Sequence, residues 1–211
     1  MKWADIKGHY DVAYSLGHNC LAASQLNHSR IRTMAGVIDW MITPQLSGVT
    51  ELLRNRFKYM MQPENMAVIG VNPLAECYIV RDAAYDIYSH HDFPLVLNTP
   101  HHLASYSILQ DKIERRSARF LNRMNLNKRT LFLRTEATRH ETSELIDVLQ
   151  QITAGEFRLL VVNHASVQNV VEMDWELPNV CTLLIPQVDN MFEDNHGIWR
   201  YILQDIYATQ Y

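Results

Sequence analysis

One cysteine stands where a strand gives way to a helix. Residues 12–16 alternate as strand residues do, and Gly17 directly after them would end the strand. His18, Asn19 and Cys20 follow, and then a stretch of good helix formers. Cys20 should therefore lie at a helix N-terminus, where backbone N–H groups and the helix dipole favour the nucleophilic thiolate. The alternative is a buried, inert cysteine, although a neighbouring histidine and asparagine are unusual choices for packing alone.

A cysteine nucleophile needs a base within hydrogen-bond reach and a further group that orients this base. His91 is our first choice of base, because it lies in the densest cluster of titratable groups in the chain. His18 is the second choice. The sequence leaves the orienting residue open among four polar side chains: Asp39, Asp92, Asn163 and Asp189.

The cluster of His90, His91 and Asp92 has metal binding as a rival use. Zinc sites need several side chains that converge, whereas adjacent histidines on a strand point to opposite faces of the sheet. We therefore predict no metal site. The turn at residues 15–20, SLGHNC, has a single glycine, so it is neither a dinucleotide fingerprint nor a phosphate-binding loop, and we predict no cofactor.

Composition places the chain among ordinary globular proteins. It has 211 residues, of which 47% are hydrophobic and 20% are charged, with a net charge of −4, so we predict no nucleic-acid partner. Its three cysteines are widely spaced and indicate a reducing compartment, the cytoplasm. No stretch approaches the roughly 20 apolar residues of a membrane helix, so we predict no membrane association. The oligomeric state is not predicted.

Helices and strands alternate in the second half of the chain. Apolar strands are predicted at 130–134, 157–162 and 180–185, and Thr138 with Glu141 forms a capping-box pattern at a helix start. Such alternation predicts right-handed crossovers and a mostly parallel sheet. We predict one three-layer, Rossmann-like α/β domain over residues 1–211, with 43–103 as a less regular insertion or lid.

The local patterns also predict individual elements outside these strands. Thr43 and Pro44 would begin a helix that extends to Met61. Further predictions are a connection over 62–73, two short strands at 76–81 and 85–88, a short helix over 166–172 and a final helix over 197–207.

Polar residues follow the predicted strands at the edge where open α/β sheets bind ligands. The residues that we predict to bind substrate there are His18, Asn19, Arg134, Glu136 and Asn163. Arg134 would clamp an anion, or alternatively form a structural ion pair with Glu136 or Asp189. Asp39 interrupts an apolar run and should need a polar partner. We expect Cys20, His91, Asp39 and Arg134 to meet at one edge of the sheet.

Four segments carry a resemblance to a known family. They are SLG-x-x-C at 15–20, G-x-x-D-W at 36–40, the segment from Tyr85 to Phe93 and Phe-Leu-Arg at 132–134. In order and spacing they resemble a bacterial family of unknown function that carries the label putative papain-like cysteine peptidase. The resemblance implies Cys20 as nucleophile, His91 as base and Asp39 as a third matched polar residue. It also implies an alternative fold, papain-like α+β. This chain has Val37-Ile38 where the family usually has Pro-Phe.

Three functions follow from these residues. The first is a cysteine-dependent hydrolase or acyltransferase that acts on an amide, peptide or acyl bond of a small-molecule, peptide or glycan-linked substrate. The second is a glycan-modifying transferase that binds a sugar or phosphate ligand through Arg134. The third is a non-catalytic binding module that uses the same pocket.

Overall fold

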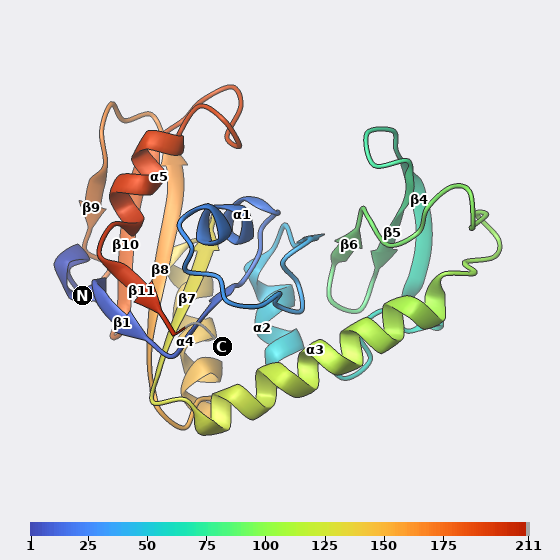
Figure 1. The fold of residues 1–211 in the computed structure, drawn as a ribbon, viewed down its shortest axis with the longest axis horizontal. Coiled ribbons are helices and arrows are strands. Elements are labelled where there is room, and N and C mark those ends of the chain that lie inside the picture. The colour runs from blue at the N-terminus through green and yellow to red at the C-terminus, as the bar shows by residue number, and fades with distance from the viewer. Residues whose placement is uncertain (210–211) are drawn as a thin grey trace.

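The computed structural model describes residues 1–209 and is built around a five-stranded sheet (Figure 1). The strand order is β2-β7-β8-β10-β9, and all neighbours are parallel except β9, which runs antiparallel to β10. These strands are β2 (Val12–Ser15), β7 (Arg129–Thr135), β8 (Glu156–Ala165), β10 (Val180–Pro186) and β9 (Val171–Met173).

Helices cover both faces of this sheet. Phe132 of β7 packs in the core that contains residues of α2 (Leu46–Arg54), α3 (Tyr106–Leu126) and α4 (Arg139–Ile152). Leu131 and Leu133, which point to the opposite face, pack with residues of α1 (Leu21–His28) and α5 (His196–Leu203). The predicted three-layer α/β architecture with a mostly parallel sheet is therefore confirmed.

A second sheet is antiparallel and has the order β3-β6-β5-β4. Its strands are β3 (Met41–Ile42), β6 (Ile87–Ser89), β5 (Cys77–Asp82) and β4 (Met66–Asn72). In Figure 1 it lies to the right of the five-stranded sheet, and α3 runs beneath both. Val80, Ile87 and Phe93 of this region belong to the same hydrophobic core as β2, so the two sheets share a core. The assignment of 43–103 as an insertion or lid stays a prediction.

Several predictions of secondary structure were wrong in segments that form strands by pairing with another part of the chain. The segment 62–73 was predicted as a connection but contains η2 (Pro63–Asn65) and strand β4, which pairs with β5. The segment 166–172 was predicted as a helix, yet Val171–Met173 forms an edge strand against β10. Partners far away in the sequence leave little trace in a local pattern.

Two predicted helices end earlier than expected. Helix α2 begins after Gln45 and ends at Arg54, and Arg56, Phe57 and Tyr59 then adopt positive φ angles, which no helix accommodates. Helix α5 ends at Leu203, and the chain continues as β11 (Ile206–Ala208), which pairs with β1 (Gly8–Tyr10) next to η1 (Trp3–Ile6).

Local capping signals were correct at two other helix starts. Cys20 is the N-cap residue of α1, and the Thr138 hydroxyl accepts a hydrogen bond from the Glu141 amide while the Glu141 carboxylate accepts one from the Thr138 amide. Within residues 1–209, no helix has the length and hydropathy needed to span a bilayer.

Candidate active site

The turn that carries Cys20 joins the end of β2 to the start of α1. Gly17 and His18 both have positive φ angles, 80° and 73°, so the chain reverses sharply before Cys20. The Asn19 side-chain oxygen accepts a hydrogen bond from the Leu21 amide at 2.8 Å, and its Nδ2 contacts the Met191 sulfur at 3.3 Å. Asn19 thus stabilises the first turn of α1, and substrate binding by Asn19 stays a prediction.

A buried polar contact holds this turn in place. Arg134, at the end of β7, is fully buried and donates hydrogen bonds through Nη1 to the Leu16 carbonyl (2.9 Å) and to Thr43 Oγ1 (2.8 Å). Its Nη2 donates to the Thr43 carbonyl at 2.9 Å. Burial lowers the pKa of Arg134 to about 10, which leaves the guanidinium charged at neutral pH. Arg134 therefore lies behind the turn with both terminal nitrogens engaged, and anion binding by it stays a prediction.

Thr43 connects the Arg134 contact to the backbone of the turn. The His18 amide donates to Thr43 Oγ1 at 2.9 Å, and the Thr43 amide donates to the His18 carbonyl at 2.8 Å. A Cβ atom on Gly17 would come within 2.4 Å of Thr43 Oγ1, so this close approach requires glycine. The helix cap predicted for Thr43 is wrong because its hydroxyl serves this contact and Gln45 is the N-cap residue of α2.

Cys20 is half-buried, whereas Cys77 and Cys181 are buried. Burial raises the pKa of the Cys20 thiol, and the nearby negative charge of Asp39 raises it further. The hydrogen bond from its own backbone amide acts in the opposite direction without compensating. The expectation that this turn favours a thiolate was therefore wrong for the resting protein, because desolvation disfavours the charged form.

Asp39 is held in a buried network next to Cys20. Its Oδ2 accepts hydrogen bonds from Arg32 Nε and from the Gly36 amide, both at 2.7 Å. Its Oδ1 is buried and has no hydrogen-bond partner within residues 1–209. The polar partner predicted for this aspartate in an apolar run is thus confirmed.

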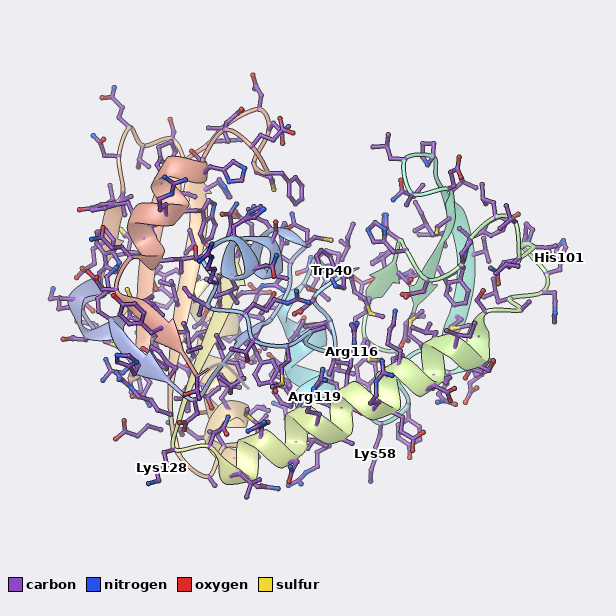
Figure 2. All side chains as sticks on the ribbon, in the orientation of Figure 1. Trp40, Lys58, His101, Arg116, Arg119 and Lys128 are labelled. Carbon is purple, nitrogen blue, oxygen red and sulfur yellow. The ribbon has the colours of Figure 1, made fainter. Side chains whose placement is uncertain are left out.

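Helix α3 fixes the loop that carries Asp39. Arg116 Nη1 donates to the Gly36 carbonyl at 3.1 Å, and Arg119 Nη2 donates to the Ala35 carbonyl at 2.5 Å. Figure 2 shows both arginines on the middle of α3, below Trp40 in this view. The loop is therefore anchored from the helix side as well as through the Asp39 carboxylate.

His91 is exposed and lies two residues after the end of β6. Met41 of β3 pairs with Ser89 of β6 in antiparallel register, so the segment before Met41 runs alongside the segment after Ser89. Asp92 accepts a hydrogen bond from the Ser89 hydroxyl and forms an ion pair with Lys112 of α3. Strand β3 thus pairs with the strand that leads to His91, and Thr43, directly after β3, contacts the turn that leads to Cys20.

A second group of titratable side chains lies at the carboxyl ends of β7 and β8. The Glu136 carboxylate accepts hydrogen bonds from His164 Nδ1 at 2.5 Å and from the His164 amide at 3.1 Å. Burial and the nearby charge of Arg134 lower the pKa of His18, and Glu136 acts against them. The structure therefore brings His18, Glu136 and His164 together.

The sequence did not predict that Glu136 and His164 would pair. The available signal was that each residue lies at the carboxyl end of one of two adjacent strands, Glu136 directly after β7 and His164 in the last two residues of β8. Asn163 is engaged within the fold, since its side chain accepts from the Ala137 amide (2.9 Å) and donates to the Ala137 carbonyl (2.7 Å). Substrate contacts of Asn163 and Glu136 stay predictions.

Comparison with known proteins identifies the family. Residues 11–167 match the family described as putative papain-like cysteine peptidase (DUF1796), and the chain belongs to this family. No curated protein and no solved structure matches the chain. No group of three or more His, Cys, Asp or Glu side chains in residues 1–209 is arranged to hold a metal ion.

The first prediction concerns the contact between Thr43 and Arg134. Thr43→Val keeps the side-chain volume but removes the oxygen that accepts from Arg134 and from the His18 amide, so we expect it to lower the free energy of unfolding by about 2–3 kcal/mol. Thr43→Ser retains the oxygen and should cost less than about 1 kcal/mol. Urea unfolding followed by circular dichroism measures both, and equal costs for the two variants would contradict the assignment.

The second prediction concerns the protonation of Cys20. Because its pKa is raised, we expect iodoacetamide to alkylate Cys20 slowly at neutral pH, with a rate that still rises above about pH 8.5, the ordinary cysteine value. Cys20 should nevertheless react before the buried Cys77 and Cys181. Peptide mapping of partially alkylated native protein measures the order, and a rate that levels off below pH 8 would show that the resting thiol is instead acidic.

Proposed function

We propose that the protein is a cysteine-dependent hydrolase or acyltransferase in which Cys20 attacks an amide, peptide or acyl carbonyl. The observation that carries this proposal is the position of Cys20: a half-buried thiol at the N-cap of α1, at the end of the short turn that follows the carboxyl end of β2. Open α/β sheets bind their ligands at this edge. Membership of the putative papain-like cysteine peptidase family supports the same chemistry.

The start of α1 would supply the oxyanion site. The first backbone N–H groups of a helix have no partner within the helix, and their dipoles point outward. The Asn19 side chain accepts from the Leu21 amide, which leaves the amides of Ala22 and Ala23 as the further donors of this turn. These donors would stabilise the negative charge that develops on a carbonyl oxygen as Cys20 attacks.

The proton of the Cys20 thiol needs an acceptor, because the resting thiol has a raised pKa. His18 is two residues away, and its lowered pKa keeps the imidazole neutral at pH 7 and able to accept a proton. His91 is the base that the family resemblance implies, and its exposed ring lies on the segment next to the Asp39 loop. We propose that one of these two histidines is the base.

Asp39 would act through charge. Its carboxylate lies close enough to Cys20 to raise the pKa of the thiol. A negative charge at this position opposes formation of a free thiolate but stabilises an imidazolium that forms beside it during proton transfer. Asp39 would thus favour attack that is coupled to proton transfer over attack by a preformed thiolate.

The third prediction tests the nucleophile and its base. With p-nitrophenyl acetate and a panel of peptide amides as substrates, Cys20→Ala should abolish turnover and leave the thermal unfolding midpoint within a few degrees of wild type. His18→Ala and His91→Ala distinguish the two bases, since losing the base should lower kcat about 10²- to 10⁴-fold. The exposed His101→Ala serves as the control. Full turnover by Cys20→Ala would refute the proposal.

A further inference from the structure

Glu136 and His164 form a carboxylate–imidazole pair at the carboxyl edge of the sheet. The His164 side chain is only 8% exposed, and the backbone of Glu136 has a φ of 55°, a strained angle for a residue other than glycine. One carboxylate oxygen, Oε1, accepts from both the ring and the backbone amide of His164. The ring is therefore fixed in orientation.

The hydrogen bond to Glu136 also determines which ring nitrogen is free. Burial alone would raise the pKa of Glu136, but the hydrogen bonds from the ring and amide of His164 outweigh it and lower the pKa. An ionised Glu136 accepts a hydrogen bond from Nδ1–H, so Nε2 of the neutral ring carries the lone pair. This is the arrangement in which a carboxylate orients a histidine that acts as a general base.

Two buried ring nitrogens in this group lack partners. His164 Nε2 and His18 Nδ1 make no hydrogen bond to any of residues 1–209. The turn at His18 lies next to Glu136, because Thr135 Oγ1 donates to the Gly17 carbonyl at 3.3 Å. The charges of Glu136 and His164 accordingly act on the pKa of His18. Buried polar atoms in proteins are nearly always hydrogen-bonded, often to an ordered water molecule. These two nitrogens are therefore suited to bind a water molecule.

This pair is distinct from the surroundings of the sulfur. The carboxylate whose charge acts on Cys20 is Asp39, whereas Glu136 acts on His18, two residues earlier in the turn. The pair is therefore suited to activate a second reactant that arrives beside the turn.

We propose that His164, oriented by Glu136, activates the water that hydrolyses the acyl group on Cys20, so that the reaction ends in hydrolysis rather than transfer. The inference rests on the proposed function of Cys20. His164 Nε2 takes one proton from the water as its oxygen bonds to the thioester carbonyl carbon. The carbon–sulfur bond then breaks, the acid leaves, and the proton on Nε2 returns to the Cys20 thiolate.

The test separates formation of the acyl-enzyme from its hydrolysis. In stopped-flow reactions with p-nitrophenyl acetate, the burst of p-nitrophenolate reports acylation, and the following steady rate reports hydrolysis. For His164→Gln we expect a burst within about twofold of wild type and a steady rate lowered about 10²- to 10⁴-fold. For Glu136→Gln, which removes only the orienting charge, we expect a steady rate lowered about 10- to 100-fold.

Hydroxylamine distinguishes loss of the base from structural damage. It attacks thioesters without a general base, so adding it should restore the steady rate of both variants to near the wild-type value. His140→Gln is the matched control, because His140 forms an exposed pair with Glu144 at 3.8 Å and should behave as wild type. Circular dichroism verifies that each variant is folded.

The outcomes separate this inference from the proposed function. The role of Glu136 and His164 is overturned if the steady rates of both variants are unchanged, or if hydroxylamine does not restore them. In either case, a burst that depends on Cys20 would still support the proposed function. Release of p-nitrophenolate that does not depend on Cys20, in the wild-type protein and in both variants, overturns both.

Discussion

The buried contact between Arg134 and Thr43 is the interaction on which the rest of the site depends. A guanidinium removed from water must donate its hydrogen bonds within the protein, and here it donates to the Leu16 carbonyl and to the side chain and carbonyl of Thr43. These acceptors belong to the turn that leads to Cys20 and to the segment that follows β3. One side chain at the end of β7 therefore fixes the nucleophile's turn and attaches the antiparallel sheet to the parallel one.

The groups around the turn also set the protonation states of His18 and Cys20. Burial and the charge of Arg134 disfavour protonation of His18. Burial and the charge of Asp39, which is held by Arg32 and the Gly36 amide, disfavour ionisation of Cys20. The resting turn thus combines a neutral imidazole with a neutral thiol. Reactivity in such a site would come from the substrate, whose carbonyl at the start of α1 allows the proton to move as the carbon–sulfur bond forms.

Local signals predicted the parts of the site that local structure determines. Gly17 predicted the turn, Cys20 the helix start, and Thr138 the capping box, because each depends on neighbours in the sequence. The pairing of Glu136 with His164 and the strands β4 and β9 depend on partners that only the folded chain brings near. Arg134 could equally have faced a ligand, since the sequence gives its position after a strand but not the atoms that surround it.

The central claim is that turnover proceeds through an acyl group on Cys20. The most direct measurement is rapid quenching of the wild-type protein during turnover of an activated ester, followed by mass spectrometry of the peptide that contains Cys20. We predict that the acyl mass appears on this peptide before steady turnover and decays when substrate is exhausted. Continued consumption of the ester by a protein whose Cys20 peptide never carries the acyl mass would contradict the account.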